Sequence, residues 1–215
     1  MKLPKLDGRR ALTARRGWAL AVVVAAVAGS AVGTVLAVQR PASSAAAPEL
    51  QAQVVWPAGA KPAPNFALRD QDGKLVTLAS ERGRPVLVTF LDSRCKRECP
   101  VEGRTLADVQ RRTAASGAVL AVVSIDPWAD TPGSARKFAA EAGWRGDWHW
   151  LLGKKARLAP VWRAYNIAVK RTPGDILHST ALYLIDARGD LRAGYLFPFS
   201  PGVVAHDVRR LGGST

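Results

Sequence analysis

Residues 85–100 read PVLVTFLDSRCKRECP, a stretch that holds both cysteines of the chain. Its first eight residues form an apolar, β-branched run bounded by turn-prone residues, which is typical of a strand buried on both faces. Pro100 is placed where proline is favoured, in the first turn of a helix that we expect over residues 100–115. The stretch therefore predicts a strand and a helix joined by a turn that carries Cys95 and Cys99.

Strands and helices alternate along the rest of the domain. Upstream, residues 66–78 predict a short hairpin around a turn at residues 70–73. Downstream we expect, in order, a buried strand over 118–126, a helix from Pro132 to about Ala142 capped by Asp130 or Thr131, a short strand over 149–152, a helix over 154–165, a hairpin of 179–186 with 191–197, and a helix over 201–211. This order predicts an α/β fold, a sandwich of the thioredoxin-like type.

The charge of the chain is concentrated in part at its start. The 215 residues include 31 Lys and Arg against 17 Asp and Glu, a net charge of +14, and six of the cations precede an uncharged run at residues 17–38. A helix of that length spans roughly 33 Å, enough to cross the hydrocarbon core of a membrane. The other cations are scattered and accompany no nucleic-acid-binding motif, so we expect no nucleic-acid partner.

Four segments follow from this pattern. We expect a basic cytoplasmic segment (1–16), a transmembrane helix (17–38), a flexible linker (39–64) and a globular domain (65–215). The apolar run is longer than the core of a usual signal sequence, which favours an uncleaved anchor over the alternative, a cleaved signal. Cations before the span favour a cytoplasmic N-terminus. The expectation is therefore a single-pass protein of the cell (plasma or inner) membrane with its domain on the extracytoplasmic side.

The two cysteines are too few to hold a fold together through disulfides, so we expect them to be chemical. Cys95 and Cys99 share one face if the backbone between them is helical. A helix N-terminus and the cations Arg94, Lys96 and Arg97 favour thiolate at both positions. The spacing leaves two functions open. A redox-active pair can form a disulfide and exchange it with a partner, or two thiolates can bind a soft metal such as Cu(I) with one further ligand.

His178 is the candidate for the further ligand. It precedes the first strand of the terminal hairpin, and in thioredoxin-like folds that loop faces the cysteine-bearing turn. Ordinary thioredoxins have a cis-proline in this loop, whereas this chain has His178-Ser179-Thr180. The remaining histidines, His149 and His206, are expected at a strand edge and at the surface. The initiator is the only methionine, which excludes a thioether ligand.

Three motifs in the same order resemble the Sco/SenC family: CKRECP at 95–100, VSIDPWADTP at 123–132 and HSTALYLID at 178–186. The resemblance extends over about residues 64–211. It implies a thioredoxin-like, membrane-anchored copper chaperone that helps to assemble the dinuclear Cu-A centre of cytochrome c oxidase. It also implies Cu(I) or Cu(II) as the bound metal, with the ligands Cys95, Cys99 and His178.

The resemblance further implies that Asp126 and Asp130 support the ligands or contact a partner. From the residues alone, these aspartates can equally be a turn and a helix cap. The implied partners are the Cu-A subunit of the oxidase, a copper donor protein and a thiol reductant. The family commonly has Pro-Asp between the cysteines, where this chain has Lys96-Arg97. The surroundings of the cysteines are therefore more positive than is usual in the family.

Other functions of the same residues remain as alternatives. A thiol–disulfide oxidoreductase that reduces partner cysteines would need Cys95 and Cys99 but not His178. Two cysteines and one histidine are also a donor set for zinc. A peroxiredoxin-like peroxidase is the least favoured, because the second cysteine is only four residues away and no peroxidase-type sequence precedes Cys95.

Overall fold

A central mixed sheet organises the domain in the computed structural model, which describes residues 50–212. The six strands lie in the order β1-β10-β9-β4-β5-β6. Their bounds are β1 Val54–Val55, β4 Val86–Leu91, β5 Val119–Ser124, β6 Trp148–Leu151, β9 Ala181–Ile185 and β10 Leu191–Leu196. Strands β4, β5 and β6 run parallel, whereas β9 is antiparallel to both β4 and β10. All residues of β4 and β5 are buried, as their unbroken apolar runs predict.

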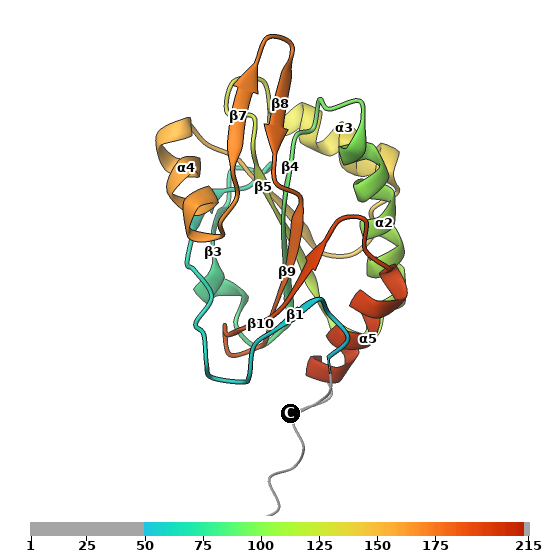
Figure 1. Cartoon of the computed structure of the whole chain (residues 1–215). Coiled ribbons are helices and arrows are strands. Elements are labelled where there is room, and N and C mark those ends of the chain that lie inside the picture. Colours follow the sequence, from blue (N-terminus) through green and yellow to red (C-terminus); the bar gives the residue numbers. More distant parts are fainter. Residues whose placement is uncertain (1–49, 213–215) are drawn as a thin grey trace, which may run out of the picture. The chain divides into compact units, whose positions relative to one another are not determined.

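Helices cover both faces of this sheet (Figure 1). On one face lie α2, α3 and α5, and on the other lie α4 and the small sheet β2–β3. The bounds are α2 Glu98–Arg112, α3 Pro132–Ala142, α4 Lys155–Ala164, α5 Pro201–Gly212, β2 Ala67–Arg69 and β3 Leu75–Thr77, with short 3-10 turns η1 Leu78–Glu81 and η2 Ala114–Ser116. Each face has its own apolar core, so the domain is the α/β sandwich that the sequence predicts.

A second small sheet stands apart from the central one. Strands β7 (Val169–Thr172) and β8 (Asp175–His178) pair with each other and project beyond the end of the central sheet in Figure 1. We did not expect strands here. Pairing opposes Val169 to His178 and Arg171 to Ile176, so these four side chains share one face of the hairpin.

The expected linker is corrected in its described part, residues 50–64. Strand β1 pairs with β10, Leu50 is buried in the core, and Pro62 bridges to Asp190. The ordered domain therefore includes this stretch, because tertiary packing outweighs its loop-like composition. The expected cytoplasmic segment, membrane span and first part of the linker lie outside the described residues. Between residues 50 and 212, no helix is long and apolar enough to cross a membrane.

Candidate metal centre

Both cysteines lie where the chain leaves β4 and enters α2. Cys99 is in the first turn of α2 and is only 1% exposed, whereas Cys95 lies in the preceding loop and is half-buried. Both are free thiols. Because their exposure differs, we call Sγ of Cys99 the inner sulfur and Sγ of Cys95 the outer sulfur.

His178 lies against the inner sulfur. Its Nε2 atom is 3.9 Å from Sγ of Cys99, and its Nδ1 atom is 3.0 Å from the backbone carbonyl of Ser179. A carbonyl oxygen only accepts hydrogen bonds, so Nδ1 carries the proton and the Nε2 lone pair faces the sulfur. Burial lowers the pKa of His178, which favours the neutral imidazole. This tautomer is the one that binds a metal through Nε2.

The two thiols share a proton. Cys99 donates a hydrogen bond to the sulfur of Cys95, which lowers the pKa of Cys95 to about 6. The backbone N–H of Arg97 also donates to that sulfur, over 3.5 Å. The same thiol–thiolate hydrogen bond, together with burial, raises the pKa of Cys99. The expectation of a thiolate at both positions is thus corrected: in the reduced domain Cys95 is the thiolate and Cys99 keeps the proton.

These three side chains fit a soft metal ion. Two sulfurs and one imidazole are donors that Cu(I) prefers, and zinc accepts the same set. The unprotonated Nε2 atom is already directed at Cys99, so no change of tautomer is needed for it to become a ligand. A bound ion would take the place of the proton that the two sulfurs share, which makes metal binding depend on pH.

Three carboxylates lie beside the cysteine loop. Asp92 follows β4 and Asp126 follows β5, and their oxygens lie within 4.8 Å of those of Asp130. Asp126 accepts hydrogen bonds from the N–H groups of Trp128 and Ala129, so it stabilises a turn, as one of our alternatives stated. Burial raises the pKa of Asp92.

Asp130 links the central sheet to the cysteine loop, residues 92–97 between β4 and α2. Its Oδ1 atom accepts a hydrogen bond of 2.9 Å from the backbone N–H of Ser93, and its Oδ2 atom accepts one of 2.6 Å from the hydroxyl of Ser124 in β5. Burial raises the pKa of Asp130 to about 6. The cap of α3 is Thr131, not Asp130. Asp130 is therefore placed to position the loop that leads into Cys95.

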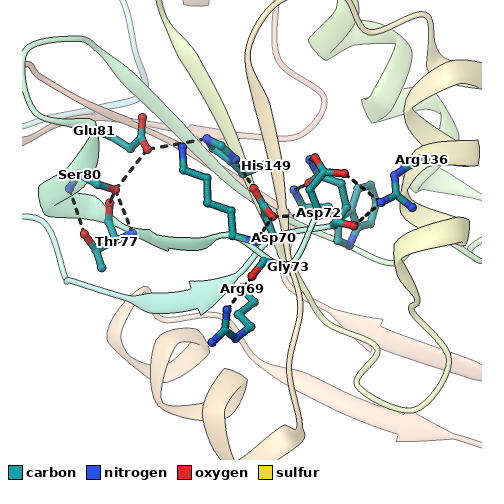
Figure 2. A network of polar contacts seen from close by, with 12 residues as sticks. Arg69, Asp70, Asp72, Gly73, Thr77, Ser80, Glu81, Arg136 and His149 are labelled. Atoms are coloured by element: carbon teal, nitrogen blue, oxygen red, sulfur yellow. Dashed lines mark hydrogen bonds and ion pairs between the residues drawn. The ribbon is translucent and has the colours of Figure 1, made fainter.

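His149 belongs to a separate polar network, shown in Figure 2. Its Nδ1 atom lies 3.0 Å from Asp70 and its Nε2 atom 3.7 Å from Glu81, and both carboxylates are buried. The imidazole links β6 to the β2–β3 hairpin and η1, so its role is structural. Sequence reasoning did not predict these two partners. His206, on α5, contacts the neighbouring Asp207.

Sequence reasoning also missed the groove outside Cys95. A cavity of about 950 Å³ lies between the cysteine loop, the turn after β5 and the β7–β8 hairpin, and Trp128 and Arg171 are among its lining residues. The signal was present in the sequence: a Pro-Gly turn at residues 173–174 separates two short runs with β-branched residues.

Comparison with known proteins identifies the family of this chain. The family model described as SCO1/SenC matches residues 57–212. The chain belongs to the SCO1/SenC family. This confirms the resemblance that the three sequence motifs indicated, and it confirms the thioredoxin-like fold.

Two relatives illustrate the extent of the match. The SCO1 protein homolog of Bacillus subtilis (strain 168) is 28% identical over 137 residues, which are 60% of this chain and 71% of that protein. The structure of Bradyrhizobium japonicum ScoI with copper bound has a TM-score of 0.60 and 28% identity, and it covers 70% of this chain and 99% of that one.

A further structure, of BsSco, is described as having a disulfide switch and as a member of the Sco family of cytochrome c oxidase assembly proteins. It matches with a TM-score of 0.63 at 23% identity, over 76% of this chain and 99% of that chain. At that identity the likeness supports the fold alone. Of these two solved structures, one is described as copper-bound and the other as a member of a family of cytochrome c oxidase assembly proteins.

Proposed function

We propose that this chain is a membrane-anchored, extracytoplasmic copper chaperone that binds its cargo through Cys95, Cys99 and His178 and delivers it to the Cu-A centre of cytochrome c oxidase. The observation that carries the proposal is the free Nε2 atom of His178, 3.9 Å from Sγ of Cys99. This nitrogen is the imidazole donor that a soft metal ion uses, and it already lies beside one of the two sulfurs. The copper-bound relative from Bradyrhizobium japonicum supports copper over zinc.

The different exposure of the two sulfurs suggests how the ion leaves. Cys95 lines the groove, so a thiolate of an acceptor protein reaches the cargo on the Cys95 side. Cys99 and His178 hold it from within until acceptor ligands replace them. Oxidation of this thiol–thiolate pair to a disulfide by an external two-electron oxidant removes two electrons and one proton and abolishes both sulfur ligands, so the redox state controls loading.

The proposal of anchoring and location depends on the sequence. An uncharged run at residues 17–38 follows a cationic start, which supports a single-pass anchor with the domain outside the cytoplasm. In this arrangement a copper donor and a thiol reductant on the same side of the membrane would load and reduce the site.

Copper titration of the reduced protein tests the ligand set. Wild type should bind one equivalent of Cu(I) in competition with a chromogenic chelator, and Cys95→Ala and Cys99→Ala should lose it. His178→Ala should bind at least about tenfold more weakly, because losing even a residue that only supports a ligand costs about 10–100-fold in metal affinity. His206→Ala is the matched control, because that histidine lies on α5 beside Asp207, and it should bind like wild type. Unchanged affinity in His178→Ala would refute the ligand assignment.

A thiol–disulfide oxidoreductase is the second candidate, favoured by the Cys95 pKa of about 6. Cys95 as thiolate would attack a partner disulfide, and Cys99 would then resolve the mixed disulfide, leaving two partner thiols and one Cys95–Cys99 disulfide. Insulin reduction by wild type and His178→Ala separates the two functions. Equal reductase activity in both, without bound copper or zinc after native purification, would favour the oxidoreductase.

A further inference from the structure

The groove outside Cys95 has walls from three separate segments. The cysteine loop supplies Arg94, Lys96 and Arg97, the turn after β5 supplies Trp128, and the β7–β8 hairpin supplies Arg171. Cys95 lies in the same groove. A molecule that occupies this groove therefore contacts the outer sulfur and the basic residues at once.

The charges that solvent meets in the groove are mainly positive. Arg94, Lys96, Arg97 and Arg171 are all exposed. Two of the lining carboxylates, Asp92 and Asp126, are buried and accept hydrogen bonds from backbone N–H groups.

The third lining carboxylate, Asp175, is part-exposed and lies 3.8 Å from Arg97. No carboxylate of the described residues is within ion-pair distance of Arg94, Lys96 or Arg171. Three of the four cations are thus available to an anionic partner.

An aromatic side chain lies among these cations. Trp128 is 43% exposed, unusually high for a tryptophan, and Arg171 packs 4.7 Å from its ring centroid. Lys155, at the start of α4, lies 5.8 Å from the same ring. Tryptophan and arginine, with tyrosine, are enriched among the residues that dominate protein–protein binding.

From these observations we infer that the groove is the docking site for an acidic polypeptide segment of the protein that exchanges copper with Cys95. The inference rests on the proposed function for the cargo, but the docking site itself is tested separately. An incoming cysteine thiolate and its flanking carboxylates are both anionic. The exposed cations of the groove attract both.

A polypeptide suits this site better than a membrane surface does. The cations line a recess that also contains Cys95 and the side of a projecting hairpin. An extended chain can enter a recess, whereas a bilayer contacts a flat or convex basic face. The groove volume of about 950 Å³ accommodates several side chains.

Binding of synthetic peptides to the reduced full-length chain in zwitterionic detergent tests the inference. The acidic probe is a labelled 12-residue peptide with two cysteines and four Asp or Glu residues, and the neutral probe has Asn or Gln in their place. Anisotropy at about 0.02 M and about 0.3 M salt should show tighter binding of the acidic probe, weakened at the higher salt concentration.

The decisive variant reverses three groove cations, as Lys96→Glu, Arg97→Glu and Arg171→Glu together. It should bind the acidic probe at least about tenfold more weakly than wild type at low salt and lose most of the salt dependence. The matched control reverses three exposed arginines that do not line the groove, as Arg104→Glu, Arg145→Glu and Arg163→Glu. Its net charge is the same, and it should bind the probe within about twofold of wild type.

Each outcome decides a separate claim. Equal losses in the two triple variants would show that overall charge and not the groove binds the peptide. No loss in the groove variant would show that the groove cations do not bind it, and either result would overturn the inference. Stronger groove-dependent binding to phosphatidylglycerol vesicles than to the acidic probe would also overturn it, in favour of a membrane contact. Copper stoichiometry is measured on every variant, so a wild type that binds no copper refutes the proposed function whichever peptide result is obtained.

Discussion

The hydroxyl group of Thr89 donates a hydrogen bond of 2.6 Å to Oε1 of Glu102, and both side chains are fully buried. The second carboxylate oxygen, Oε2, has no hydrogen-bond partner in the described part of the chain. Glu102 is one turn after Cys99 on α2. Burial raises its pKa from 4.5 to about 7, because little but the Thr89 hydroxyl compensates the loss of solvent.

Replacing Glu102 by Gln should change how stability depends on pH. The unfolded chain releases the Glu102 proton near pH 4.5, whereas the folded domain keeps it to about pH 7. The stability that the neutral carboxyl contributes is therefore fully present below pH 4.5 and is lost as pH rises through about 7. Glu102→Gln, which has no proton to lose, should exceed wild type in unfolding free energy by about 1–3 kcal/mol at pH 8 and match it near pH 5.

Urea unfolding at the two pH values measures this difference. Glu141→Gln is the control, because Glu141 is an exposed residue of α3 that pairs with Lys137, and its effect should be small at both pH values. A variant that is equally stable relative to wild type at pH 5 and pH 8 would contradict the raised pKa.

Alkylation of the reduced protein should distinguish the two cysteines. Cys95, with its pKa of about 6, should react with iodoacetamide with a rate that reaches half its maximum near that pH, whereas Cys99 should react slowly at neutral pH. Cys99→Ala removes the thiol that donates to Cys95, so the midpoint for Cys95 should rise towards its ordinary value. Peptide mass spectrometry follows each site. A midpoint that does not move in Cys99→Ala would show that the nearby cations, and not the shared proton, set the reactivity.

Asp130→Ala should loosen the loop that leads into Cys95. The change leaves the N–H group of Ser93 and the hydroxyl of Ser124 without their acceptor, and unpaired buried donors cost about 1–3 kcal/mol of unfolding free energy. The alkylation rate of Cys95 should change as well. Asp108→Ala, which removes a part-exposed carboxylate on α2 and its surface ion pairs with Arg111 and Arg112, should cost less than about 1 kcal/mol and leave that rate unchanged. An Asp130→Ala protein with wild-type stability and reactivity would exclude this positioning role.

Gly103 of α2 packs closely against Phe138 of α3. A methyl group on Gly103 would lie 2.7 Å from a ring carbon of Phe138, so Gly103→Ala should destabilise the domain by about 1–3 kcal/mol despite the better helix propensity of alanine. A methyl group on Gly133, near the start of α3, would have only one atom within 4 Å, the hydroxyl oxygen of Thr131 at 3.9 Å. Gly133→Ala should therefore be neutral or slightly stabilising. Thermal unfolding of both variants checks the pair, and equal effects would contradict the close contact.

The elements that could be predicted from the sequence are those whose apolar composition indicates that they are buried. The apolar runs at residues 85–92 and 118–126 became β4 and β5 because both faces of each strand are covered. The β7–β8 hairpin was missed because Val169 and Ile176 share their face with Arg171 and His178, so apolar and polar residues do not alternate between the two faces. Strand β1 has only two residues, and its pairing with β10 depends on packing that no local pattern reveals.

The candidate site was predictable in part for a similar reason. Cys95 and Cys99 follow from their position between a strand and a helix, and His178 from its position before β9 in a thioredoxin-like order. The shared proton depends on which sulfur is buried, and the tautomer of His178 depends on the carbonyl of Ser179. Neither can be read from residue types, because both arise from contacts of fixed geometry.

Cys99 and His178 are 79 positions apart in the chain, whereas Cys95 and Cys99 are near neighbours. An unfolded polypeptide thus offers two thiols at high local concentration and no imidazole beside them. During synthesis, the domain acquires its third donor only once β8 has paired with β7 and β9 has joined the central sheet. On the proposed ligand assignment, only the fully folded domain brings all three metal ligands together. A nascent or damaged chain offers the two thiols alone.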